Sequence, residues 1–510
     1  MKKLLTELNL PGANAFNAVS VPVADFAKVS ERIVEHGIPL VLMYATDERK
    51  KSSVFVIHAV FQIEGELLTI ESDVSPENPS YPSLTRSIMA AHWYERQIMD
   101  QFGIEAVGHP DPRRLMHHEN IPEGTYPMRK DFEWDTKLAH ANVPYPMHQV
   151  EGEGVYEIPV GPIHAGIIEP GHFRFNVRGE RIITLEGKLF FKHKGVLKLV
   201  EGKTPEEALP FVERVSGDMV VGHTLAFVQA VEKVSGVKVS ERAEYLRVIW
   251  SELERACAHI FDMGNMGGMG TGFTFMAAQG FRMVEEMRRL NQSLVGHRFL
   301  RGAIVLGGAH DITAEMEEKI QTTLKRIEKD MREVLEIAYA KDGLKERFET
   351  TGILSREAAL AYGAQGIAAR SSGVDIDLRR DMPYAAYDEL DVAVMPEKAG
   401  DVLARFTLRA RELTESFRLI RLALMKLPLG DAKVSVPHGT GDAYGFAESW
   451  RGAVMDFVRL DSKGRIDRLV IRDPSFCNWA LFGELAPGNI VPDFPLCNKS
   501  LNLSYSGTDL

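Results

Sequence analysis

Apolar positions along the chain follow two periods, one typical of strands and one typical of helices. Residues 54–71 are rich in β-branched and aromatic side chains and contain the turn Glu64-Gly65-Glu66, which predicts a β-hairpin. Two further hairpins are expected, one at residues 181–192 with Glu186-Gly187 at its centre, and one at residues 454–471. Strands are therefore expected in three separate parts of the chain.

Longer segments have apolar residues at spacings of three and four, which is the pattern of one buried face on a helix. Helices are expected at residues 241–262, 281–300, 316–335 and 402–427. The glycines between Gly264 and Gly272 follow the first of these helices, whereas a dinucleotide-binding glycine motif follows a strand. We therefore interpret this glycine cluster as a turn between two helices.

Proline and glycine gather in residues 136–160, which have the irregular composition of a linker. This linker separates a small α+β domain at residues 15–135 from a large domain at residues 161–510. The large domain is expected to be mainly helical, with β-hairpins at its periphery. The predicted fold class is α+β.

Charge and cysteine content exclude several classes of function. The 60 Lys and Arg residues against 71 Asp and Glu give a net charge of -11, so a nucleic-acid partner is not expected. No window approaches the roughly 20 apolar residues of a membrane-spanning helix, so any membrane association is expected to come through partners. The three cysteines form no CxxC pair and are too few to hold an iron–sulfur cluster within this chain.

Three blocks near the N-terminus resemble the signature of the complex I 30-kDa subunit family. These blocks are Glu95–Ile104, Gly108–Leu115 and Pro127–Phe132, and they occur in the same order as in that family. From Gly161 onward, the chain resembles the complex I 49-kDa subunit and the large subunit of membrane-bound [NiFe]-hydrogenases of the formate-hydrogenlyase type. The resemblance implies a hydrogenase-large-subunit-like fold for residues 161–510. The matching blocks are Gly161–His164, Glu169–Arg174, Glu241–Arg247, Gly352–Leu354, Arg370–Asp375, Pro383–Tyr387 and Arg472–Asn478.

The main departure from the hydrogenases concerns their metal ligands. The family supplies four thiolates from two CxxC pairs, and nickel and iron need such soft ligands. The corresponding positions here are Ser216, Met219, Ser475 and Asn478, and Cys477 lies one residue out of register. The resemblance therefore implies that the Ni-Fe centre is absent. The quinone-binding positions of the complex I relatives also differ, with Glu169 or Pro170 where those proteins have His and Gly217 where they have Tyr.

The resemblance also implies a candidate proton relay. Glu169 and His172 correspond to the place where hydrogenases keep a relay carboxylate and its neighbour, and Asp218 adds a second acid. We expect these acids to share one enclosed, polar cavity, with their pKa values raised by desolvation and mutual repulsion. The alternative is a surface hairpin with ordinary charges. The residues expected to line the cavity are Ser216, Gly217, Met219, Ser475 and Asn478.

Other polar residues have simpler interpretations. His223, His259 and His297 lie on predicted helical segments, and each is expected to be a hydrogen-bonded core histidine rather than a ligand. Arg174, Arg370 and Arg472 either form structural ion pairs or line the cavity, and the sequence does not separate these options.

The preferred functional hypothesis is an oxidoreductase subunit that couples electron flow to quinone reduction or to proton or ion translocation. Its expected partners are a small subunit bearing a [4Fe-4S] cluster, a ferredoxin-like iron–sulfur subunit and integral membrane subunits, and its expected place is peripheral, on the cytoplasmic face of the membrane. The chain itself is expected to hold no cofactor, with quinone as a possible ligand. The alternative is a non-catalytic scaffold that docks cluster-bearing subunits onto a membrane arm. Hydrogenase activity itself is not expected.

Overall fold

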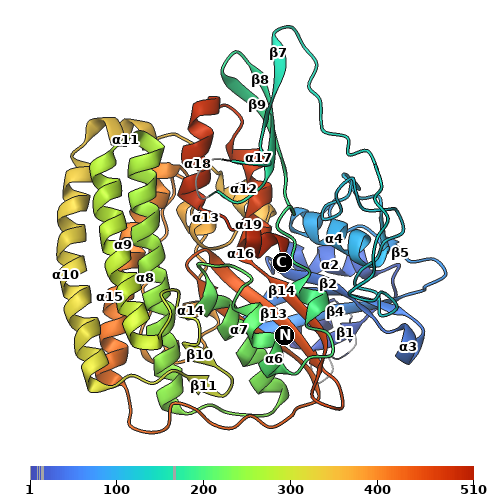
Figure 1. Ribbon diagram of the computed structural model, residues 1–510. Coiled ribbons are helices and arrows are strands. Elements are labelled where there is room, and N and C mark those ends of the chain that lie inside the picture. Colours follow the sequence, from blue (N-terminus) through green and yellow to red (C-terminus); the bar gives the residue numbers. More distant parts are fainter. Residues whose placement is uncertain (1, 9, 11, 13–16, 165–167) are drawn as a thin grey trace.

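The computed structural model describes residues 2–8, 10, 12, 17–164 and 168–510, and it consists of a small sheet-containing unit beside a large, mainly helical unit (Figure 1). This arrangement confirms the predicted α+β class. Within the described residues, no helix combines the length and the apolar character needed to cross a membrane.

The small unit is built around a four-stranded sheet in the order β1-β4-β3-β2, with β1 parallel to β4 and the other pairs antiparallel. The predicted first hairpin is confirmed as β3 and β4, and its turn places Glu64 and Gly65 at φ 46° and 80°. The elements of this unit are α1 (Lys2–Glu7), β1 (Ala18–Ser20), α2 (Phe26–Glu35), β2 (Leu40–Asp47), α3 (Arg49–Ser52), β3 (Phe55–Ile63), β4 (Glu66–Val74), β5 (Ser80–Pro82), α4 (His92–Phe102) and β6 (Glu105–Val107).

A long segment without helix or strand, residues 108–154, leads from the small unit to a three-stranded antiparallel sheet. This sheet contains β7 (Val155–Val160), β8 (His172–Arg178) and β9 (Arg181–Lys188), so the last six residues of the expected linker are a strand. The second hairpin was predicted with the wrong turn. The chain reverses at Gly179-Glu180, whereas Gly187 lies within β9 opposite Phe173, where a methyl group would contact the Phe173 ring.

The large unit contains a bundle of four long helices, α8 (Glu241–Thr271), α9 (Thr274–Val295), α10 (Ala314–Tyr339) and α15 (Val402–Lys426) (Figure 1). All four were predicted, but the glycine cluster is not a turn. It lies inside α8, because the backbones of α8 and α9 touch there: a methyl group on Gly280 would lie 2.8 Å from the Cα atom of Gly264. The chain reverses only after Gly272, at φ 77°.

A second antiparallel sheet, β12-β13-β14, lies between the bundle and the small unit (Figure 1). The predicted third hairpin is confirmed as β13 and β14, and β12 extends it. The hydroxyl groups of Tyr44 and Tyr444 form a hydrogen bond of 2.9 Å between the two units. The remaining elements are α5 (Val196–Leu199), α6 (Pro205–Val212), α7 (Val220–Val234), β10 (Ile304–Val305), β11 (Gly308–Ala309), α11 (Asp342–Phe348), α12 (Arg356–Ala361), α13 (Gly366–Ser371), α14 (Leu378–Asp381), β12 (Gly441–Ser449), β13 (Gly452–Leu460), β14 (Ile466–Arg472), α16 (Pro474–Asn478), α17 (Phe482–Leu485), α18 (Phe494–Leu501) and α19 (Tyr505–Asp509).

Candidate functional site

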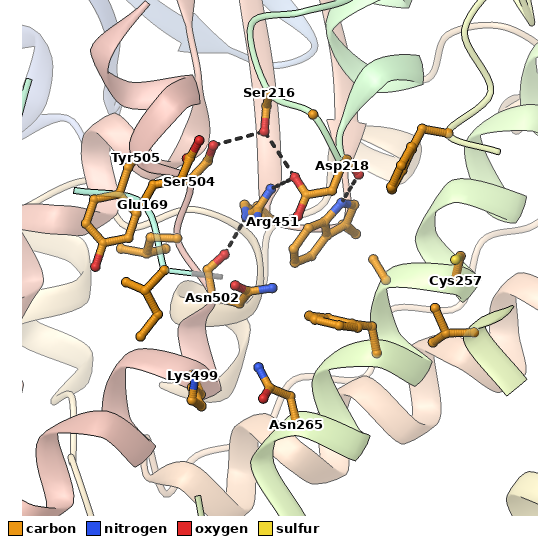
Figure 2. Close-up of a pocket in the computed structure, with 18 of the residues that line it drawn as sticks. Glu169, Ser216, Asp218, Cys257, Asn265, Arg451, Lys499, Asn502, Ser504 and Tyr505 are labelled. Carbon is orange, nitrogen blue, oxygen red and sulfur yellow. Dashed lines mark hydrogen bonds and ion pairs between the residues drawn. The ribbon is translucent and has the colours of Figure 1, made fainter. Parts of the chain in front are cut away.

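A cavity of about 860 Å³ opens where the bundle, the loop before α7, the loop before β8 and the C-terminal helices meet (Figure 2). Glu169, Ser216, Gly217 and Asp218 line it, as the resemblance implied. Much of the remaining wall is apolar and aromatic. The cavity therefore combines a polar patch with an apolar body, which is the usual composition of a small-molecule site.

The loop 216–218 is positioned by a carboxylate from the neighbouring helix α8. Glu254 accepts hydrogen bonds from the backbone N–H groups of Val221 and Gly222, at 2.7 and 3.2 Å. These N–H groups belong to the first turn of α7 and have no partner within that helix. Glu254 thus fixes the start of α7 and with it the loop that faces the cavity.

Hydrogen bonds among three serines join the two segments that the resemblance aligns with the metal-ligand cysteines of the hydrogenases. The Ser216 hydroxyl lies 2.9 Å from the hydroxyl of Ser504 and donates to the Asp218 carboxylate at 3.1 Å. The backbone N–H of Ser504 in turn donates to the Ser475 hydroxyl at 3.0 Å. The two segments, which lie more than 250 residues apart in the sequence, are therefore connected through one residue of the C-terminal region.

Glu169 reaches the same place from the loop before β8. Its carboxylate accepts a hydrogen bond from the backbone N–H of Ser506 at 2.9 Å, and the Ser506 hydroxyl donates to the Val215 carbonyl at 2.8 Å. Glu169, the loop 216–218 and Ser475 are thus brought together indirectly, because each is hydrogen-bonded to residues 504–506.

Asp218 does not behave as the sequence analysis expected. Burial by itself raises the pKa of Asp218. The Arg451 guanidinium donates to both of its carboxylate oxygens, at 2.7 and 2.9 Å, and the Ser216 hydroxyl donates to it as well. Together these groups outweigh burial and hold the pKa of Asp218 below its ordinary value. The prediction of a raised pKa for this residue is wrong. Arg451 also lies 3.8 Å over the ring of Trp450, so the ion pair stands against a flat apolar wall (Figure 2).

Two other acids near the cavity have raised pKa values. Burial raises the pKa of Glu254 to about 8, with a smaller contribution from Asp218, although the backbone N–H groups of α7 act in the opposite direction. Burial also raises the pKa of Asp262 to about 6, against the influence of Arg409. Glu254 lines the cavity, so the acid that can exchange a proton near neutral pH is Glu254 rather than Asp218.

Several predicted site residues lie outside the cavity wall. Met219 packs against Trp450, and both hydrogen-bonding groups of the Asn478 amide are used by the backbone of Gln365. Ser475 lies behind Ser504 and is fully buried. His172 begins β8 and its Nδ1 atom lies 3.2 Å from the Gly161 carbonyl oxygen. These four residues support the wall or lie near it, but they do not face the enclosed space.

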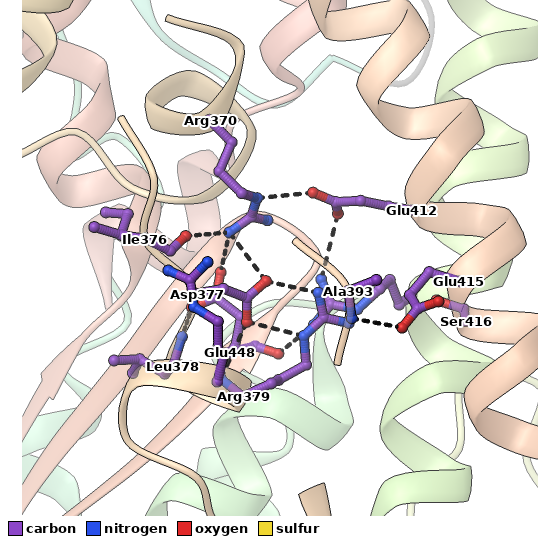
Figure 3. A network of polar contacts seen from close by, with 12 residues as sticks. Arg370, Ile376, Asp377, Leu378, Arg379, Ala393, Glu412, Glu415, Ser416 and Glu448 are labelled. Atoms are coloured by element: carbon purple, nitrogen blue, oxygen red, sulfur yellow. Dashed lines mark hydrogen bonds and ion pairs between the residues drawn. The ribbon is translucent and has the colours of Figure 1, made fainter. Parts of the chain in front are cut away.

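A network of buried charges lies deeper in the large unit, between the bundle and β12 (Figure 3). Arg370 donates to Glu412 and to Glu448, each at 2.8 Å, and Arg379 donates to Asp377 at 2.6 Å. The question left open for Arg370 is therefore answered by ion pairing. Arg174 likewise pairs with Glu157 at 2.7 Å, and Arg472 donates to the backbone carbonyls of Val41 and Ala453.

The buried network continues to the cavity wall. His259 Nε2 lies 3.0 Å from Glu412, and Arg409 lies 2.6 Å from Asp262, which accepts a hydrogen bond from the cavity residue Asn502. Burial lowers the pKa of His259 to about 4, so its ring is neutral near pH 7. His259 and His223, the latter 2.9 Å from Asp473, are both hydrogen-bonded core histidines, as predicted. The same prediction is wrong for His297, which lies in the turn after α9 and is only half-buried.

The side chains at the four former ligand positions do not fit a nickel–iron centre. They offer two hydroxyls, a thioether and an amide, and the hydroxyls and the amide are engaged in the hydrogen bonds described above, while the thioether is packed against Trp450. Nickel and iron in this setting need thiolates. In the part of the chain that the structure describes, no three His, Cys, Asp or Glu side chains are arranged to hold a metal ion.

Comparison with known proteins identifies the two units. Residues 19–137 match the model of the respiratory-chain NADH dehydrogenase 30 Kd subunit, and residues 268–440 and 432–510 match that of the 49 Kd subunit. The chain is 30% identical over 488 residues to formate hydrogenlyase subunit 5 of Escherichia coli, covering 92% of this chain and 84% of the relative. It is 30% identical over 490 residues to hydrogenase-4 component G of the same organism, covering 93% and 84%. It is 25% identical over 553 residues to an NADH-quinone oxidoreductase subunit of Aquifex aeolicus, covering 96% and 93%.

The fold and these matches define the class of the protein as a complex-I-like oxidoreductase subunit. The chain belongs to the family of fused complex I 30-kDa and 49-kDa subunits, which includes formate hydrogenlyase subunit 5 and hydrogenase-4 component G.

Proposed function

We propose that this chain is the large subunit of a membrane-associated redox assembly that works without a Ni-Fe centre and whose cavity binds an electron acceptor such as a quinone. The observation that supports this most directly is the cavity itself, which lies where Glu169, the loop 216–218 and Ser504 meet. Its aromatic wall suits an apolar ring, and its polar patch suits the oxygen atoms of a quinone. Glu254 and Glu169 would exchange protons with the acceptor as it is reduced.

In this proposal, electrons reach the cavity from a partner. The three cysteines, Cys257, Cys477 and Cys497, lie free on separate elements and cannot ligate a cluster together. A small subunit with a [4Fe-4S] cluster would deliver the electrons, and a ferredoxin-like iron–sulfur subunit would supply that small subunit. Integral membrane subunits would hold the assembly on the cytoplasmic face of the membrane.

Elemental analysis tests the metal-free part of the proposal. The chain purified with its native partners is expected to contain no stoichiometric nickel, because no thiolate stands at any of the four ligand positions. Stoichiometric nickel together with hydrogen uptake would contradict it. The isolated chain should also lack the visible absorption of thiolate–iron charge transfer.

Turnover by the whole assembly tests the redox part. Reduction of a soluble quinone by the purified complex should be lost on Glu169→Gln and on Glu254→Gln, because these carboxylates are the proposed proton exchangers, and it should be lowered on Asp218→Asn, which removes a charge from the cavity wall. Glu336→Gln is a matched control, since Glu336 is exposed on α10, away from the cavity lining. Thermal unfolding of each complex verifies that the variants assemble.

A second candidate function is a non-catalytic scaffold that docks cluster-bearing subunits onto a membrane arm. It is favoured by one observation: the four replaced positions and Asp218 are all engaged within the protein, so the former metal site is closed by hydrogen bonds and an ion pair. Unchanged turnover in Glu169→Gln and Asp218→Asn would support the scaffold and reject catalysis in this cavity.

A further inference from the structure

The cavity has a second end, formed by α9 and the loop that follows it. Three arginines line this end, namely Arg288, Arg298 and Arg301. Arg298 donates to Glu285 at 2.7 Å. Among the residues that the structure describes, no carboxylate lies within 4.0 Å of the Arg288 or Arg301 guanidinium. The Nε atom of each of these two arginines is buried without a hydrogen-bond partner. Two guanidinium groups are thus partly buried, and neither forms an ion pair with a carboxylate of the described residues.

Aromatic rings lie next to the Arg288 guanidinium, although the carboxylates of Glu285 and Glu254 line the same cavity. This guanidinium lies 4.9 Å over the ring of Phe299 and 5.8 Å from that of Phe261. The Cys257 thiol lies beside it, and burial raises the pKa of that thiol to about 11, so the sulfur carries no negative charge near pH 7. The Arg288 guanidinium therefore packs against aromatic rings, and no carboxylate in the described part of the chain accepts a hydrogen bond from it.

Two buried amides add to this end of the cavity. Asn265 and Asn291 line the cavity at 3% and 2% exposure, and the side-chain oxygen of each has no hydrogen-bond partner. Figure 2 shows the Asn265 side chain directed into the cavity. Buried polar atoms are normally satisfied by protein or by bound molecules. Because these two oxygens accept hydrogen bonds, they indicate an N–H or O–H group on the body of a bound molecule, not its anionic group.

We propose that this end of the cavity binds a small organic anion, namely a carboxylate, phosphate or sulfonate group attached to an aromatic body. Arg288 and Arg301 contact the anionic group, and the aromatic body lies along Phe261, Phe281 and Phe299. A cavity of about 860 Å³ has the size of a small-molecule site, which is roughly 300–1,000 Å³. The inference concerns binding at the α9 side and does not depend on redox chemistry at Asp218 or Glu169.

A pair of fluorescent probes tests this inference on the full chain. 8-Anilinonaphthalene-1-sulfonate bears an anionic group on an aromatic body, and N-phenyl-1-naphthylamine is the same body without the sulfonate. The wild-type chain should bind the anionic probe at least about tenfold more tightly than the neutral one, since only the sulfonate can accept charge-assisted hydrogen bonds from the two guanidinium groups. The double variant Arg288→Gln/Arg301→Gln should lose that preference while it keeps its affinity for the neutral probe.

Arg289→Gln is the matched control, because Arg289 is the next residue of α9 and its side chain is 79% exposed. It should leave both affinities unchanged. Equal binding of the two probes by the wild type, or an unchanged preference in the double variant, would overturn the inference. The inference would also be overturned if the intact assembly showed no preference for the anionic probe. In that case the two arginines would pair with an acidic residue of a partner protein.

Discussion

Two buried polar regions of the large unit differ in how their charges are matched. In the network around Arg370, each arginine meets carboxylates, and the charged side chains are buried (Figure 3). In the cavity, Asp218 keeps 42% of its side-chain surface accessible, and Arg288 and Arg301 lack carboxylate partners among the described residues. Matched charges hold elements together, whereas unmatched charges beside an open space are available to bind something else.

The two regions also use different elements. The closed network is contributed mainly by regular helices and a strand, including α13, α15 and β12, which fix the positions of its side chains. The cavity wall also uses helices α8, α9 and α18, but its polar patch around Asp218 comes from the loops before α7 and β8 and from the C-terminal residues beyond α18. Substitutions should therefore lower stability most in the first region and affect pH dependence or binding in the second.

The largest effect is expected for Arg370→Met. Removing this buried guanidinium leaves Glu412 and Glu448 without their main partner, which should lower the free energy of unfolding by about 3–5 kcal/mol. Denaturant unfolding of the purified chain measures this. Arg332→Met, at an exposed position on α10, is the control and should change little. A loss as small as that of the control would show that the closed network does not hold the fold.

Glu254→Gln should change how stability depends on pH. The folded-state pKa of Glu254 is raised to about 8 by burial, so the folded state holds this proton more tightly than the unfolded state does. The wild type should therefore lose roughly 3 kcal/mol relative to the variant as the pH rises from about 5 to 8. Unfolding midpoints across this range test the slope. Parallel pH profiles of the two proteins would mean that Glu254 is ionised throughout.

Asp218→Asn should have a smaller effect with the opposite dependence on pH. The pKa of Asp218 is held below its ordinary value, so its contribution is present above about pH 4 and is lost as the pH falls further. Because the carboxylate is open to the cavity, a loss of about 1–2 kcal/mol near pH 7 is expected. Stability measured at pH 7 and pH 3 should show the difference shrinking. A constant difference would exclude the ion pair with Arg451 as its cause.

Ser504→Ala should give the smallest effect. Its hydroxyl caps α19 by accepting from the Gly507 N–H at 2.8 Å, and it also bonds to Ser216. Loss of such a cap costs about 1 kcal/mol. Ser504→Thr keeps a hydroxyl and should restore most of this stability. Equal losses in both variants would point to packing rather than capping.

Sequence patterns predicted the parts of the fold that depend on local periodicity. The bundle helices and the hairpins β3-β4 and β13-β14 follow from apolar spacing and turn residues. Two of the errors concern glycine. Gly187 lies inside a strand, where its neighbours leave room for a side chain, whereas Gly264 lies inside a helix because the backbone of Gly280 on the next helix touches it. Such a close approach leaves no local pattern.

The candidate site was predictable only in part, for a similar reason. The resemblance to the hydrogenases located Glu169 and the loop 216–218, but nothing pointed to Arg451, which lies 233 residues from its partner Asp218. Ser504 is 288 residues from Ser216. The pKa of Asp218 depends on such a distant partner, so its direction could not be derived from the neighbouring residues.

The contact between Gly264 and Gly280 has a mechanical consequence for the cavity. Because the backbones of α8 and α9 touch there, the two helices cannot slide past one another without steric overlap. Asn265 on α8 and Arg288 and Asn291 on α9 therefore belong to one stiff wall of fixed spacing. On the opposite side, the width of the cavity depends instead on hydrogen bonds, such as those that join Ser504 to Ser216 and Ser506 to Glu169.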